Sequence, residues 1–169
     1  MDLQTAANLA EVLGILIVIV GFTFAVVQLM QFRQQRRDMA TIELARSFQN
    51  PEFAHAIRCI TMCPIGLSAE QLKKQGSGYE NAAFLVSFTF ESVGVMVHRR
   101  IVSLDMVWEL MGGTILGAWE RLEAWAKDVR AEQGRDKFDE WIEWLVGQLR
   151  EKEALDEQPA YRKYGDWKP

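Results

Sequence analysis

Three polar residues share one face of an otherwise apolar segment. Ser87, Glu91 and His98 are spaced so that an α-helix places Ser87 and Glu91 each within about 20 degrees of His98. A carboxylate with a shifted pKa working beside a histidine is the kind of pair that moves protons. Glu91 and His98 would, however, lie about 10 Å apart along the helix axis, too far for direct contact. We therefore expect this polar stripe to be buried and structural.

The structural interpretation pairs Glu91 with an arginine of a neighbouring helix, such as Arg121 or Arg130, and leaves His98 at an exposed helix end. The alternative is an enzyme or a proton-linked sensor centred on Glu91 and His98. Gly94 is expected to allow close helix packing, because the chain has no glycine-rich phosphate-loop pattern. No nucleophile with an adjacent base is evident either. The sequence thus predicts no catalytic residue, no cofactor and no small-molecule substrate, and we expect no enzyme.

The two cysteines are the other reactive groups. Cys59 and Cys63 lie four residues apart on one predicted helix, a spacing that disfavours a disulfide in a compartment that keeps thiols reduced. A metal site would need further ligands, and the only histidines are His55 and His98. We predict buried, inert thiols and no metal site.

An uncharged run over residues 12–32 must anchor everything that follows. It is long enough at about 1.5 Å per residue to cross a hydrocarbon layer of roughly 30 Å. Arg33, Arg36 and Arg37 follow it, whereas no Lys or Arg precedes it. This asymmetry predicts one crossing, with the N-terminus outside and the C-terminal domain in the cytoplasm. The run lacks the basic start of a cleavable signal and should remain as an anchor.

Small residues recur within this run. Ala10 with Gly14, and Gly21 with Ala25, have the spacing that lets two helices approach closely in lipid. They predict self-association in the bilayer. An alternative is a small channel formed by several copies, in which Thr23 and Gln28 would be the polar residues that line the pore.

The rest of the chain shows helical periodicity and no strand-like alternation, which predicts an all-α protein. A long transmembrane helix should continue into a helical bundle, with segments at 1–37, 38–153 and 154–169. Residues 82–97 contain one charge, Glu91, but are about four residues short of a span. We expect them to form the core helix of the bundle instead of a second crossing. The predicted helices cover about 5–50, 51–62, 68–74, 79–99, 104–133 and 138–153.

Two groups of aromatic residues fall outside the apolar stripes by which the predicted helices should face the core of the bundle. Trp125 and Trp144 do not fit those stripes and are expected to face outward as contact residues. The tail is expected either to dock on a neighbouring subunit or anionic lipid, or to be loosely held. It interleaves aromatic and basic residues: Tyr161, Arg162, Lys163, Tyr164, Trp167 and Lys168.

The charge balance excludes one class of partner. Of 19 Lys and Arg and 23 Asp and Glu, three and two lie in residues 1–37, so the remainder has an acidic excess of five. A nucleic-acid binder needs clustered surplus cations, and we expect none here.

Four segments carry a family resemblance: QQRRDMATIELARSFQNPEFAHA, FTFESVGVMVHRRIVS, the region of Trp119-Glu120-Arg121, and WIEWL. With the apolar run before them, they make the chain resemble a bacterial family of small single-span proteins catalogued as a domain of unknown function. The resemblance implies an N-terminal transmembrane helix, a cytoplasmic helical domain and the bacterial inner membrane. It implies no activity.

These features together predict a membrane-anchored helical scaffold, adaptor or accessory subunit. Its expected partners are the lipid bilayer, further copies of itself or another membrane protein.

Overall fold

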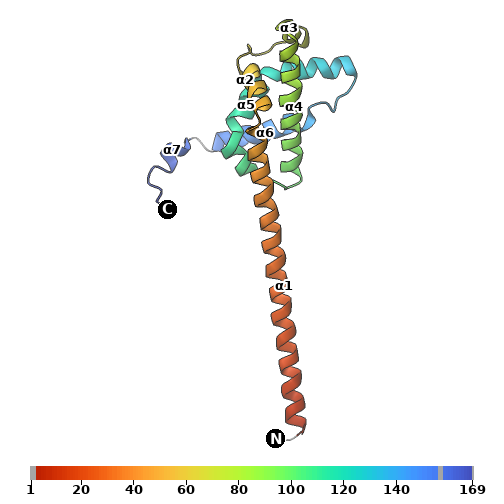
Figure 1. The fold of residues 1–169 in the computed structure, drawn as a ribbon, viewed down its shortest axis with the longest axis vertical. Helices are drawn as coiled ribbons and strands as arrows, with labels where there is room; N and C mark the ends of the chain where they lie inside the picture. Colours follow the sequence, from red (N-terminus) through yellow and green to blue (C-terminus); the bar gives the residue numbers. More distant parts are fainter. Residues whose placement is uncertain (1–2, 156–157, 169) are drawn as a thin grey trace. The chain divides into compact units, whose positions relative to one another are not determined.

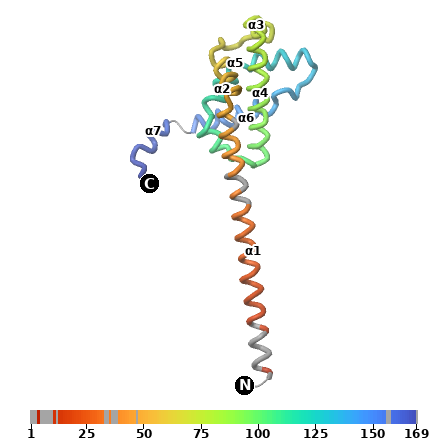
Figure 2. The backbone as a smooth tube through the Cα atoms, in the orientation of Figure 1, coloured from red at the N-terminus to blue at the C-terminus, as the bar shows by residue number. Residues whose placement is uncertain are grey.

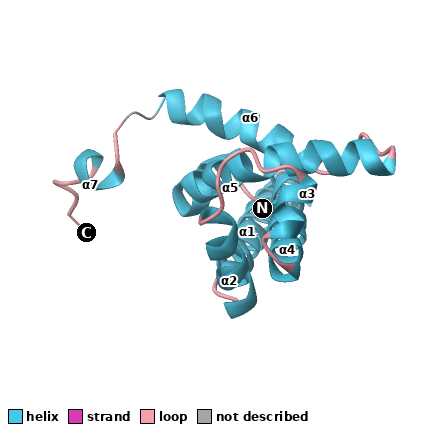
Figure 3. Cartoon of the chain, turned by 90° about the horizontal axis from the view of Figure 1, so that it is seen from above, coloured by secondary structure: helices cyan, strands magenta, loops and turns pink. Residues whose placement is uncertain are grey.

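The computed structural model describes residues 3–155 and 158–168, with the backbone alone for residues 3, 5–10, 12, 33–34, 36–38 and 47. Every regular element in those ranges is a helix (Figures 1 and 3). The predicted all-α class is therefore confirmed. The chain divides into two compact units, residues 1–40 and 41–169, and each is described by itself.

Helix α1 (Leu3–Phe48) forms the first unit and continues into the second (Figure 2). Its apolar part, Leu13–Phe32, has none of its residues buried. The Thr23 hydroxyl donates to the carbonyl of Ile19 at 2.8 Å, so this polar group is satisfied within its own helix. An apolar N-terminal helix is thus present, as predicted.

The first turns of the second unit follow local capping chemistry. The Asn50 side chain accepts from the Glu52 amide at 2.9 Å and begins α2 (Pro51–Thr61). Ser68 and Gln71 form a reciprocal capping box that begins α3 (Ala69–Lys74). Both helix starts were expected from the sequence, because capping depends on residues a few positions apart.

Helix α4 (Ser77–His98) is the core of the second unit and packs against α2, α3, α5 and α6. Val86 and Phe90 are fully buried, and Val93 is 1% exposed. By length and composition α4, like Leu13–Phe32, could also cross a membrane. However, 44% of its most apolar stretch is buried inside the protein. Its burial is what the predicted core helix requires.

Two further helices complete the packed part of the second unit. Ser103 caps α5 (Leu104–Gln133), which ends at Gly134 in the left-handed conformation, with φ of 60°. After a short turn the chain enters α6 (Glu140–Leu155), which packs on both α4 and α5 (Figure 3). A single turn of helix, α7 (Ala160–Lys163), lies near the C-terminus.

Candidate functional site

The predicted polar stripe of α4 lies along its contact with α6. Glu91 meets the first turn of α6, Gly94 meets the backbone of Trp141, and His98 meets the ring of Trp141. Ser87 bonds to Asp139, the residue immediately before α6. The stripe is therefore a structural seam between two helices, which we call the α4–α6 joint.

Glu91 caps α6 from a different helix. Its Oε2 accepts hydrogen bonds from the backbone amides of Trp141 at 2.9 Å and Ile142 at 2.8 Å. The first amides of a helix have no partner within it, and a carboxylate beside them is also favoured by the helix dipole. The predicted arginine partner is wrong, because the first backbone amides of α6, which have no partner within their own helix, take its place.

Competing effects act on the acidity of Glu91. Burial raises its pKa, and the negative charges of Asp139 and Glu140 act in the same direction. The two amide hydrogen bonds oppose this by stabilising the carboxylate, but the pKa remains above its ordinary value. Glu91 is therefore a half-buried acid whose ionised form is stabilised by backbone amides in the first turn of α6.

Asp139 is the second acid of the joint. Its backbone has a φ of 58°, its residue is 2% exposed, and the Ser87 hydroxyl donates to its Oδ1. Its Oδ2 is buried without a hydrogen-bond partner. Burial raises the pKa of Asp139, whereas the Ser87 hydrogen bond and the charge of Arg130 lower it. The net shift is upward, as expected for an acid with one unsatisfied oxygen.

Arg130 fastens the turn that leads into α6. Its Nε donates to the carbonyl of Phe138 at 2.6 Å, and its Nη2 donates to the carbonyl of Asp139 at 3.1 Å. Its Nη1 lies 2.7 Å from a carboxylate oxygen of Glu143. The second predicted partner of Glu91, Arg121, instead donates to the carbonyls of Cys63 and Gly117. Both arginines thus hold backbone.

Gly94 permits the close approach of α4 and α6. A Cβ atom at this position would lie 2.4 Å from the carbonyl oxygen of Trp141. The predicted packing role of Gly94 is confirmed.

His98 is exposed at the end of α4 and contacts two indole rings. Its ring centroid lies 4.6 Å from that of Trp141 and 5.6 Å from that of Trp144. Trp144 is only partly exposed, since these rings cover one side of it. The Glu91 carboxylate thus contacts backbone amides, whereas the His98 ring contacts the indole rings of Trp141 and Trp144.

The outward orientation predicted for Trp125 is wrong. Trp125 is 1% exposed, and its ring packs edge-on against Phe84 at 5.1 Å and Phe138 at 5.6 Å. Phe138 belongs to the turn between α5 and α6, which the helical pattern of α5 alone does not reveal. This turn covers the side of α5 that was expected to face outward.

The cysteines are free thiols. The Cys59 sulfur lies 3.5 Å from Nε2 of His55, and the Cys63 thiol donates to the carbonyl of Cys59 at 3.3 Å. Cys63 is buried, and burial raises its pKa. Cys59 is only half-buried, so the prediction of burial holds fully for Cys63 alone. Among the described residues, no group of three or more His, Cys, Asp or Glu is arranged to hold a metal ion.

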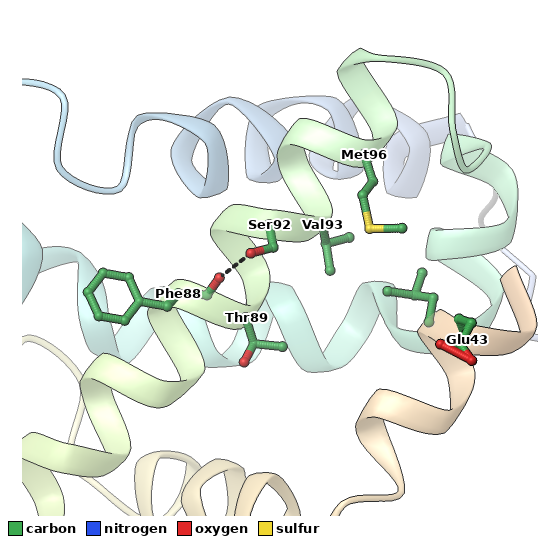
Figure 4. A pocket seen from close by; sticks show the side chains of 7 residues that line it. Glu43, Phe88, Thr89, Ser92, Val93 and Met96 are labelled. Atoms are coloured by element: carbon green, nitrogen blue, oxygen red, sulfur yellow. Dashed lines mark hydrogen bonds between the residues drawn. The ribbon is translucent and has the colours of Figure 1, made fainter. Parts of the chain in front are cut away.

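The outer face of α4 carries a groove that sequence reasoning missed. The cavity measures about 490 Å³, and Figure 4 shows the side chains around it, including Phe88, which is 57% exposed. The hydroxyls of Thr89 and Ser92 donate to carbonyls of their own helix, at 2.6 and 2.8 Å. This face can therefore be covered without leaving those hydroxyls unpaired. The groove is lined by Glu43, Leu44, Phe88, Thr89, Ser92, Val93 and Met96.

The remaining candidate residues lie in the first unit. Gly14, Gly21 and Ala25 are exposed along α1, and a Cβ at either glycine would meet nothing within 4 Å. These positions are open to another helix. The predicted membrane-interface side chains lie outside the described residues: Arg33, Arg36 and Arg37.

The fold and the joint define an all-α protein that combines an exposed apolar N-terminal helix with a compact helical unit. The chain belongs to the family described as DUF4760, a domain of unknown function, which matches residues 15–149. The resemblance to a domain-of-unknown-function family is thereby confirmed. No curated protein and no solved structure matches the chain.

Proposed function

We propose that this protein is a single-pass membrane protein of the bacterial inner membrane, whose helical unit acts in the cytoplasm as a self-associating scaffold, adaptor or accessory subunit. The observation that carries the proposal is the Leu13–Phe32 segment, which is apolar over 20 residues and has none of them buried. Apolar side chains exposed along 20 residues of a helix are unfavourable in water and match a lipid environment. The arginines after the segment, with none before it, support the proposed orientation.

The contacts of α4 support one crossing instead of two. Glu91 projects from the middle of α4 and is stabilised by the amides of α6. Moving α4 into lipid would remove those donors and leave an ionisable group in hydrocarbon, which is costly. The same helix buries Phe90 and Val86 in the second unit.

A scaffold role is supported by how the polar groups of the joint are used. Glu91 caps α6, Arg130 holds the preceding turn, and Ser87 bonds to Asp139. These contacts fix the position of α6 on α4. A helical unit held together in this way can present a fixed outer surface to a partner.

The α4 groove supports self-association. Phe88 is 57% exposed and Leu85 is 37% exposed beside it, while Thr89 and Ser92 have their hydroxyls satisfied. We propose that a second copy of the chain occupies the groove. In every copy this face follows the apolar segment by the same number of residues, so two anchored copies carry matching faces. Anchoring in one bilayer raises the effective concentration of copies for one another.

Mass measurement of the full-length protein in detergent tests this proposal. We expect a dimer or larger assembly, which Phe88→Ser shifts towards monomer. Leu155→Ser is the matched control, because Leu155 is also exposed, at 85%, but lies outside the groove. A wild-type protein that is monomeric in detergent and in lipid discs, with no co-purifying protein, would contradict the scaffold role.

A further inference from the structure

The C-terminal segment, residues 158–168, exposes three aromatic rings. Tyr161 is 72% exposed, Tyr164 is 54% exposed and Trp167 is 71% exposed. Of the six tryptophans, Trp119 and Trp125 are buried, three are partly exposed, and Trp167 is largely exposed. Large rings left in water at the end of a well-packed unit indicate a surface that binds something.

Basic side chains accompany these rings. Arg162 lies 5.5 Å from the ring centroid of Tyr161, and Lys163 lies at the same distance from that of Tyr164. Together with Lys168 they outnumber the one acid of this segment, Asp166. The segment is thus positive, although the chain beyond residue 37 is acidic as a whole.

Part of the segment also borders a hollow beside α5. Lys163 and Tyr164 line a hollow together with Trp108 and Glu109 of α5. The hollow lies between this part of the segment and α5, while the rings of Tyr161 and Trp167 remain exposed. The positive charges and the rings are therefore presented together.

From this arrangement we infer that residues 158–168 bind the surface of an anionic lipid bilayer. Tyrosine and tryptophan favour the headgroup level, where an apolar ring and a polar group are both accommodated. Lysine and arginine beside them are attracted by the negative surface potential of anionic lipids. The positive charge of the segment is the complement of that surface.

The inference rests on the proposed membrane anchor. A segment with three cations would bind vesicles only weakly from solution. On a chain already held at the bilayer, the same contact is intramolecular, and a high effective concentration compensates for weak affinity. The anchor therefore makes this small surface sufficient.

Quenching by brominated lipids tests the inference on the full-length protein in lipid discs. The discs contain phosphatidylcholine alone or an equal mixture with phosphatidylglycerol, and bromine on the acyl chains quenches nearby indoles. The contribution of Trp167 is the difference between wild type and Trp167→Phe. We expect that contribution to be quenched at least about twofold more strongly in the anionic discs.

Two charge variants separate the segment from general surface charge. Arg162→Gln, Lys163→Gln and Lys168→Gln combined should abolish the dependence on lipid charge. Lys73→Gln with Lys74→Gln, at exposed positions on α3, is the matched control and should leave it unchanged.

Equal quenching of Trp167 in neutral and anionic discs, from a protein that stays in the disc, would overturn the inference alone. A Trp167 signal that depends on the number of chains per disc instead of lipid charge would assign the segment to a second copy and also overturn it. A protein that leaves the disc during gel filtration would contradict the proposed anchor itself.

Discussion

Replacing Glu91 with alanine should destabilise the second unit through the start of α6. The substitution leaves the amides of Trp141 and Ile142 without the oxygen that now accepts from both. Loss of a helix cap typically costs about 0.5–2 kcal/mol, and loss of a partly buried charge at a helix end up to about 2 kcal/mol.

Part of that loss is returned, because the burial that raises the pKa of Glu91 also makes its charge costly. We therefore expect Glu91→Ala to lower the free energy of unfolding by about 2 kcal/mol. Glu91→Gln keeps an acceptor oxygen and should cost about half as much. The order of the two variants follows directly from the capping geometry.

Urea unfolding of the full-length protein in detergent, followed by tryptophan fluorescence, measures both effects. Glu151→Ala is the control, because Glu151 is exposed on the same helix, and its effect should stay within about 0.5 kcal/mol. Equal stability of Glu91→Ala and wild type would refute the capping role. Glu91→Gln losing as much as Glu91→Ala would show that the charge, and not the acceptor, matters.

Four further substitutions test the packing and the charges of the second unit. Gly94→Ala should cost about 1–3 kcal/mol by urea unfolding, because its Cβ meets the backbone of α6, whereas Gly113→Ala has open space and should be neutral or stabilising. The raised pKa values of Glu91 and Asp139 mean that the folded protein binds protons more tightly than the unfolded chain. Stability should therefore fall as pH rises from the ordinary values of 4.5 and 3.8 through the folded-state pKa values, and Asp139→Asn should flatten that fall in a pH series of unfolding midpoints. Trp125→Ala should cost about 3–5 kcal/mol in the same unfolding assay, and a cost below 1 kcal/mol would show that its ring is not part of the core.

Local signals in the sequence predicted the helix boundaries well. Asn50, Ser68 and Ser103 cap the helices that follow them, and Gly134 ends α5 in a left-handed conformation. Each of these features depends on residues within one turn of the helix end, so the sequence contains the whole cause.

Features that depend on two helices meeting were only half predictable. The spacing of Ser87, Glu91 and His98 correctly placed them on one face, but their partners depend on how α6 lies on α4. The helical periodicity suggested arginines as partners for the Glu91 carboxylate. It could not reveal that unpaired backbone amides of α6 would lie nearer to that carboxylate. Trp125 was misassigned for a similar reason, since the turn containing Phe138 covers it from outside its own helix.

The exposed groove on α4 could not be predicted from the sequence, because its apolar residues look like core residues. Phe88 and Met96 are apolar members of a helix that is apolar on nearly every side. Periodicity alone could not distinguish the side covered by α2 and α6 from the side left open.

Alkaline extraction of membranes from bacteria producing the full-length protein tests the central claim most directly. We predict that the wild-type chain stays in the membrane pellet, because in our proposal the exposed apolar segment Leu13–Phe32 spans the bilayer. Phe22→Arg, near the middle of this segment, should release much of the chain, since a central arginine opposes insertion by about 2.5–3.5 kcal/mol. Release of the wild-type protein into the alkaline supernatant would contradict the claim that this helix anchors it.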